Sequence, residues 1–316
     1  MSAQAAAMTA EDIVRQGGAA ANRPIEGEAA VRAAIEFKNV TCRFETPQGD
    51  YTATEHVSFH VQAGEFVSVV GPTGCGKSTI LNMAAGLLPV SEGEVRIFGE
   101  KLSGLNRRAG YMFQAESLMP WATAIDNVAM PLFYRGVPKR EAHERAMAWL
   151  ERVGLAAFPN RYPHELSGGM RKRVAMAQTL VADPDILLMD ESFSALDVQT
   201  RELMENELLA IWEKEKKAVL FITHDLDEAV SMSDRVVVMS AGPASHPVGN
   251  FVIDLPRPRD LIEIRMDRAF LQQRAEIWNV LRDEVMKSYR DHRSAMLSPG
   301  AAEAAAGGPG AGGMDD

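Results

Sequence analysis

The stretch Gly71-Pro72-Thr73-Gly74-Cys75-Gly76-Lys77-Ser78-Thr79 decides the fold of this chain. It fits the pattern G-x-x-x-x-G-K-[S/T], follows the apolar run 66–70 and precedes a helical pattern at 80–88. The glycines let the backbone curl so that its N–H groups face a phosphate, and the start of the helix adds partial positive charge. We expect Lys77 to contact the β- and γ-phosphates of a nucleotide and Ser78 to ligate Mg²⁺. Cys75 is expected only to fill space.

Composition limits the classes of protein to consider. The chain has 316 residues, 46% of them hydrophobic, which is enough for one large α/β domain or two modest ones. A formal net charge of −10 argues against a main partner that is nucleic acid or an anionic lipid surface. Cys42 and Cys75 form no repeated pair, which suits a reducing cytoplasm. No apolar run reaches about 18 residues, so we expect membrane attachment only through a partner.

The order of patterns along the chain predicts an α/β protein. Alternating apolar residues at 34–70 indicate a small sheet that leads into a buried central strand. The continuous apolar runs at 186–189 and 219–222 are typical of parallel strands covered by helices on both faces. Residues 115–180 are mainly helical in pattern. A last set of apolar residues at helical spacing predicts a C-terminal packing helix: Phe270, Leu271, Ile277, Trp278, Leu281 and Val285.

Two adjacent carboxylates, Asp190 and Glu191, end the apolar run 186–189. Adjacent acids at a strand end are often only helix caps. A phosphate-binding loop upstream favours a catalytic interpretation, because Mg²⁺-dependent phosphoryl chemistry needs such a carboxylate. We expect Asp190 to hold Mg²⁺, commonly through water, and Glu191 to orient or deprotonate the attacking water.

The segment Leu166-Ser167-Gly168-Gly169-Met170 precedes the helical pattern at 171–181. Ser167 and the following amides therefore form a second helix start that suits an anion, although alone this would be an ordinary N-cap. One nucleotide does not need two phosphate-binding helix starts far apart in sequence. A head-to-tail pair of chains resolves this, because each chain then gives its second site to the nucleotide of the other.

Two polar residues lie after predicted strands. A lone histidine is more often structural than catalytic, but His224 directly follows the central strand 219–223, which favours a catalytic role. Gln114 lies between the phosphate loop and the helical segment, where its amide could touch Mg²⁺ or water.

Together, these motifs resemble the ATP-binding-cassette (ABC) ATPases over residues 35–240, and Leu-Ser-Gly-Gly is the signature of that family. The resemblance implies that Gln114 is the Q-loop residue, that 194–197 is the D-loop and that His224 is the switch histidine that senses the γ-phosphate. It implies Phe44 as the aromatic residue that stacks on adenine, with Tyr51 as the alternative.

The resemblance also implies the ligands of Mg²⁺ and ATP. The catalytic residues would be Glu191, His224, Gln114 and Lys77, and the metal ligands Ser78, Gln114 and Asp190. The nucleotide-binding residues would be Phe44, Gly71, Pro72, Thr73, Gly74, Cys75, Gly76, Lys77, Ser78, Thr79, Ser167, Gly168 and Gly169.

The expected fold is an α/β P-loop NTPase core with a mixed or parallel sheet, an N-terminal antiparallel β subdomain and a helical signature subdomain. The expected divisions are a disordered tail (1–33), an ATPase domain (34–255, with the helical subdomain at about 115–180), a C-terminal helical extension (256–294) and a disordered low-complexity tail (295–316).

A narrower resemblance rests on residues 110–114, 118–128 and 162–171, which look like the ATPase subunits of nitrate, sulfonate and taurine importers. It implies a second copy or a paralogue, two membrane permease subunits, a periplasmic or surface binding protein, and a place on the cytoplasmic face of the plasma membrane. Three positions depart from the family pattern, Ser192 for Pro, Lys172 for Gln and Gln178 for Arg, and none of them removes a catalytic group.

Three other classes compete with an importer subunit. An exporter or a lipoprotein-release system would use the same motifs. A soluble ABC ATPase acting on nucleic acid usually carries two cassettes and coiled-coil or zinc insertions, which this sequence lacks, so we expect no direct nucleic-acid partner. A small-molecule kinase would leave the signature motif unused.

Overall fold

The computed structural model describes residues 33–47, 49–194 and 196–297. Almost all of the two predicted tails, 1–33 and 295–316, lies outside these residues, as does Ala195 of the predicted D-loop. Within the described part, no helix is both long enough and apolar enough to span a bilayer.

An antiparallel sheet forms the N-terminal part of the fold, as the alternation of apolar residues predicts. Its order is β2-β1-β4-β5, and Phe37 on β1 stacks on Phe59 of β2 with ring centroids 4.7 Å apart. The strands are β1 (Ala33–Thr46), β2 (Gly49–Gln62), β4 (Glu92–Ile97) and β5 (Glu100–Lys101).

A second sheet of six strands has the order β10-β9-β3-β8-β7-β6. Neighbouring strands from β9 to β6 pair in parallel, and only β10 is antiparallel. This confirms the predicted mixed sheet with a buried centre, since every residue of β3 and β8 is buried. The strands are β3 (Phe66–Val70), β6 (Ala109–Met112), β7 (Ile186–Asp190), β8 (Ala218–Ile222), β9 (Arg235–Met239) and β10 (Pro247–Val252).

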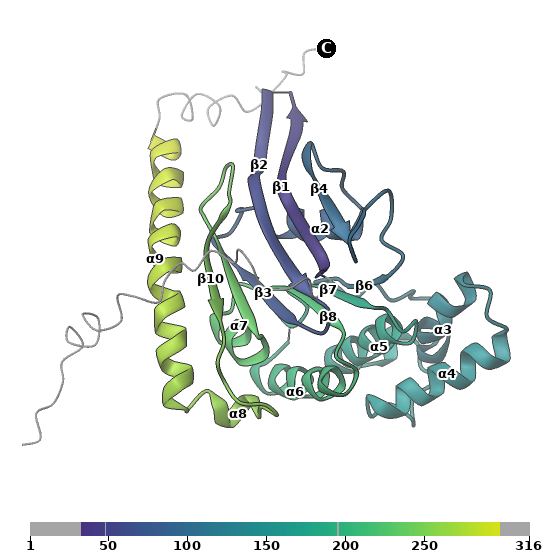
Figure 1. The fold of residues 1–316 in the computed structure, drawn as a ribbon. Helices are drawn as coiled ribbons and strands as arrows, with labels where there is room; N and C mark the ends of the chain where they lie inside the picture. Colours follow the sequence, from purple (N-terminus) through teal and green to yellow (C-terminus); the bar gives the residue numbers. More distant parts are fainter. Residues whose placement is uncertain (1–32, 48, 195, 298–316) are drawn as a thin grey trace, which may run out of the picture.

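Helices cover both faces of this sheet. Helix α2 (Lys77–Ala85) shares one apolar core with strands of both sheets, so it is enclosed between them. A second core joins the opposite face to four helices, and Figure 1 shows α3 and α4 on the side of the molecule away from α9. The four helices are α3 (Ala124–Tyr134), α4 (Lys139–Arg152), α5 (Gly168–Leu180) and α6 (Val198–Glu215), with the short helix η1 (Pro163–Glu165) before α5.

The C-terminal extension contains α8 (Leu261–Ile264) and α9 (Arg268–Leu297), which lie beside α7 (Leu226–Met232). Only part of the predicted packing face is correct. Phe270, Ile277 and Leu281 are buried in a third core with α7 and β9, whereas Leu271, Trp278 and Val285 are exposed. Leu271 and Trp278 each come one position after a buried residue, and a step of about 100° per residue turns their side chains off the buried face.

Two neighbouring residues of α9 test this assignment of faces. Phe270→Ala should lower the free energy of unfolding by about 3–5 kcal/mol, because it leaves a cavity in the third core. Leu271→Ala should change it by no more than about 0.5 kcal/mol, because that side chain is half exposed. Urea titration of the full chain measures both, and equal losses for the two variants would contradict the described face.

Candidate active site

Four of the predicted motifs meet at one edge of the six-stranded sheet, where parallel strands end together. Val69 of β3 and Asp190 of β7 both pair with Ile222 of β8, and Met112 of β6 pairs with Met189 of β7. The phosphate loop follows β3, and Glu191 follows β7. His224 lies two residues after the end of β8, and Gln114 lies two residues after the end of β6. The crevice outside the carboxyl ends of parallel strands is the usual ligand site of an open α/β sheet.

The phosphate loop leads into a helix start whose amides have no side-chain cap. Gly76 is the N-cap of α2 at φ 84°, and no side chain caps that end of the helix. A Cβ on Gly76 would lie 2.6 Å from Thr54 Cγ2, so this position requires glycine. Lys77 Nζ donates to the carbonyl oxygens of Gly71 (2.9 Å) and Pro72 (3.0 Å), which holds its ammonium group along the loop. The loop therefore offers several N–H donors and one cation to an anion.

Asp190 lies between the phosphate loop and β6. Its Oδ1 accepts a hydrogen bond from Ser78 Oγ at 3.1 Å, and Tyr111 Oη lies 3.5 Å from its Oδ2 and 3.1 Å from Asn82 Oδ1. Burial raises the pKa of Asp190 above its ordinary value, and the hydrogen bond from Ser78 opposes that rise. A hydroxyl, a carboxylate and the amide oxygen of Gln114 are hard oxygen donors, the type that Mg²⁺ prefers. The residues present therefore fit a Mg²⁺ ion.

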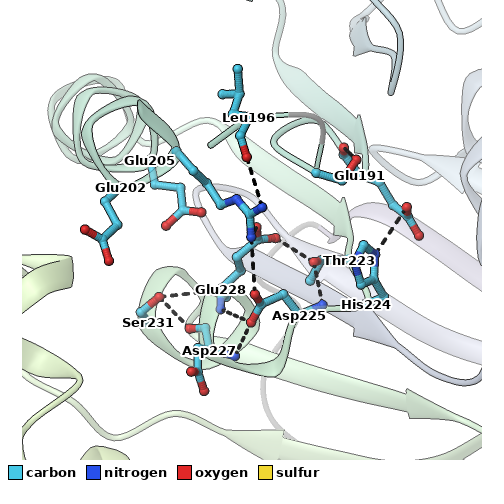
Figure 2. Close-up of polar contacts among 12 residues, drawn as sticks. Glu191, Leu196, Glu202, Glu205, Thr223, His224, Asp225, Asp227, Glu228 and Ser231 are labelled. Carbon is cyan, nitrogen blue, oxygen red and sulfur yellow. Dashed lines mark hydrogen bonds and ion pairs between the residues drawn. The ribbon is translucent and has the colours of Figure 1, made fainter. Parts of the chain in front are cut away.

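Glu191 is contacted by two of the other predicted catalytic residues, Gln114 and His224. Its Oε2 accepts a hydrogen bond from Gln114 Nε2 at 3.3 Å and lies 3.2 Å from His224 Nδ1, a contact drawn in Figure 2. The backbone of Glu191 has φ 42°, and its N–H donates to Ile222 O at 2.9 Å. A left-handed conformation is uncommon for a residue other than glycine and clusters at functional sites. The turn directs the carboxylate toward Gln114 and His224.

The signature segment starts α5 as predicted. Ser167 is its N-cap and accepts a hydrogen bond from Met170 N–H at 3.2 Å. A Cβ on Gly169 would lie 2.8 Å from Thr200 Cγ2, so glycine permits the close approach to α6. Among the described residues, no hydrogen bond or ion pair joins this segment to the phosphate loop. The binding of one nucleotide between the phosphate loop of one chain and the signature segment of another therefore stays a prediction.

The two candidates for adenine stacking are cross-strand neighbours. Phe44 on β1 pairs with Tyr51 on β2, and Phe44 is partly buried against the core between the sheets while Tyr51 is 42% exposed. Cys75 is buried, and burial raises the pKa of its thiol, as expected of a residue that fills space.

Sequence reasoning missed a contact between the signature helix and the Q-loop. Lys172 of α5 is 3% exposed, and its Nζ donates to the carbonyl oxygens of Phe113 (3.1 Å) and Gln114 (3.0 Å). Burial lowers the pKa of this lysine. The only signal in the sequence was that lysine replaces the usual glutamine. Ser192, another departure, donates to Met112 O at 3.2 Å and so ties the end of β7 to β6.

Comparisons with known proteins agree with this geometry. The family model for ABC transporters matches residues 54–194. An uncharacterized ABC transporter ATP-binding protein of Methanocaldococcus jannaschii is 46% identical over 81% of this chain and 94% of that protein. The taurine import ATP-binding protein TauB of Rhizobium johnstonii is 44% identical over 72% of this chain and 88% of that protein. The aliphatic sulfonates import ATP-binding protein SsuB of Bacillus cereus is 40% identical over 72% of this chain and 89% of that protein.

Solved structures share the fold. A dimeric, post-hydrolysis structure of the ATP-binding cassette MJ0796 bound to ADP and Pi aligns with a TM-score of 0.63 and 32% identity, over 70% of this chain and all of that one. A second dimeric structure of that cassette aligns equally well, at 33% identity. This chain belongs to the ATP-binding proteins of ABC transporters and is an ATPase of that family.

Proposed function

We propose that this chain is the ATP-hydrolysing subunit of an importer for a small solute of the nitrate, sulfonate or taurine class. The observation that carries the proposal is the contact of one carboxylate, Glu191, with both Gln114 and His224 beside the phosphate loop. The importer class is supported by the names of TauB and SsuB, each similar over more than two thirds of this chain. Neither name supports an exporter or a nucleic-acid ATPase.

The residues divide the chemistry among them. Lys77 and the loop amides bind the phosphates, and Glu191 accepts a proton from, or orients, the attacking water. His224 and Gln114 both hold the Glu191 carboxylate, so its direction depends on the position of each loop. Ser78, Asp190 and Gln114 would hold Mg²⁺, which supplies charge neutralisation at the phosphates when bound.

The working unit in this proposal is a dimer of this chain or of the chain with a paralogue. Ser167, Gly168 and Gly169 at the start of α5 would bind the nucleotide held by the phosphate loop of the partner. The dimeric state of the MJ0796 cassette supports this arrangement.

A groove beside the Q-loop is the proposed docking site for the permease on the cytoplasmic face of the membrane. It has a volume of about 710 Å³ and lies between α2, β6 and the end of α3. Its rim exposes the large apolar side chains of Leu87, Leu105, Phe113 and Tyr134. Phe113 directly precedes Gln114, so an element bound in the groove would touch the loop that contacts Glu191. The proposed periplasmic binding protein would meet the permease, not this chain.

Glu191→Gln tests the assignment of the hydrolytic base. The variant should bind ATP as well as the unchanged chain and lose steady-state turnover by about 10²–10⁴-fold, because the amide cannot take the proton. With ATP it should accumulate as a dimer in light scattering after gel filtration. Glu141→Gln on the exposed face of α4 is the matched control. Normal turnover, or a monomer with ATP bound, would refute the assignment.

Leu105→Glu tests the groove. Leu105 is 64% exposed, so the change should leave the unfolding temperature within about 2 °C but should abolish co-purification with co-expressed permease subunits. Leu203→Glu on α6, 55% exposed in the free chain, is the control and should co-purify normally. Equal co-purification of both variants would place the permease elsewhere.

A further inference from the structure

A pair of glutamates is buried next to the loop that carries His224. Glu205 of α6 is 0% exposed and Glu228 of α7 is 3% exposed, and each carboxyl group influences the pKa of the other. Glu205 Oε1 is buried and accepts no hydrogen bond from the described residues. A carboxylate can only accept hydrogen bonds, so a proton on Glu205 Oε1 would give this buried atom a hydrogen bond to donate to Glu228. Burial and the charge of Glu228 raise the pKa of Glu205 to about 8, and burial raises the pKa of Glu228 as well. With a pKa of about 8, Glu205 keeps its proton at neutral pH.

Glu228 fixes the residues on either side of the switch histidine. Thr223 Oγ1 donates to Glu228 Oε2 at 2.6 Å and accepts from Asp225 N–H at 3.0 Å, as Figure 2 shows. The Asp225 carboxylate in turn caps α7 by accepting from the backbone N–H groups of Asp227 and Glu228. His224 lies between Thr223 and Asp225, so its backbone position depends on where Glu228 is held.

Arg201 joins the same pair to the D-loop. Its Nη1 lies 3.5 Å from Asp225 Oδ2 and 3.7 Å from Glu228 Oε1, and its Nη2 donates to Leu196 O at 3.2 Å. One guanidinium group therefore contacts both a D-loop carbonyl and the acids around the switch loop (residues 223–225).

Glu205 extends the network into the C-terminal extension. Arg265, directly after α8, donates from Nη2 to Glu205 Oε2 at 3.1 Å and from Nη1 to Glu202 at 3.0 Å. Two further arginines of the extension bind α7, the helix that carries Glu228. Arg259 donates to carbonyl oxygens at the C-terminal end of α7, and Arg274 forms an ion pair with Asp227 of the same helix.

We propose that Glu205 is a positioning residue for ATP hydrolysis: by donating its proton to Glu228, it holds the switch loop, the D-loop and the C-terminal extension in one arrangement. The inference rests on the proposed role of His224. With the proton on Glu205, Arg201 lies beside the anions Glu228 and Asp225, and Arg265 binds Glu202 and the neutral Glu205. Glu202 and the Asp227–Arg274 pair lie at the edge and are partly exposed.

Loss of the proton breaks this balance. Above pH 8, Glu205 becomes a second buried carboxylate directly opposite Glu228, and like charges at that distance in a dry interior repel strongly. The separation of α6 and α7 displaces Thr223 and Asp225, and His224 then loses its place beside Glu191. Turnover falls, while the nucleotide-binding residues of the phosphate loop are untouched.

The test is the pH dependence of ATP turnover by the full chain, with Glu205→Gln as the main variant. Glutamine keeps an N–H donor for Glu228 and an oxygen for Arg265 but cannot lose a proton. Between pH 7.5 and pH 9 the kcat of the unchanged chain should fall roughly tenfold, as expected for a group with a pKa of about 8. The kcat of Glu205→Gln should change less than about twofold, and the KM for ATP should be the same in both.

Two controls make the result specific. Glu202→Gln removes the other carboxylate bound by Arg265 and should keep the alkaline fall of the unchanged chain. Glu205→Ala removes the donor and should show a low kcat at every pH, with circular dichroism at the assay temperature confirming that it is folded. The same alkaline fall in the unchanged chain and in Glu205→Gln would overturn the proposal.

A measurement without ATP separates this proposal from the proposed function. The unfolded chain releases the Glu205 proton near the ordinary pKa of 4.5, whereas the folded chain keeps it to about pH 8. Stability should therefore fall as pH rises between these values, because the unfolded state binds fewer protons. In Glu205→Gln this part of the fall should be absent. If the unfolding curves of the two proteins run parallel, the shared proton is refuted, whatever the turnover shows.

Discussion

The parallel register of β6, β7 and β8 is the constraint on which the active site depends. Asp190 pairs with Ile222 and Met112 with Met189, so the three strands end at one level. The residues just beyond these ends are therefore neighbours in space although they are far apart in sequence. A shift of β7 by one residue would turn each of its side chains, including Asp190, to the other face of the sheet. The carboxylate of Glu191, which follows β7, would then no longer lie between Gln114 and His224.

Much of this arrangement could be predicted from the sequence, because it depends on short apolar runs followed by polar residues. The runs 186–189 and 219–222 identified β7 and β8, and the phosphate-loop pattern identified the start of α2. The fold class is confirmed by the structure and by the cassette relatives. The roles of the individual site residues stay predictions, since the geometry shows their contacts and not their chemistry.

The remainder could not be predicted because it depends on contacts between distant segments. Nothing near Lys172 in the sequence indicates that its ammonium group meets the carbonyl oxygens of residues 113 and 114. Likewise, Glu205 and Glu228 each look like an ordinary surface acid of a helix, and only the packing of distant segments in the folded chain buries them. On α9, helical spacing fits more than one face, and only the neighbouring core selects the face that contains Phe270.

The hydrogen bonds of Lys172 connect the signature helix α5 with the Q-loop, two motifs that lie far apart in the sequence. Lys172 lies four residues after Gly168, the first residue of α5, and hydrogen bonds from a charged donor to a carbonyl contribute about 1.5–3 kcal/mol each. The lysine is buried, so separating it from the Q-loop would also leave an unpaired charge in a dry site. A displacement of the Q-loop therefore moves the start of α5 with it. Because Phe113 lines the groove beside that loop, a partner bound in the proposed docking site would act on Glu191 through Gln114 and on Ser167 through α5.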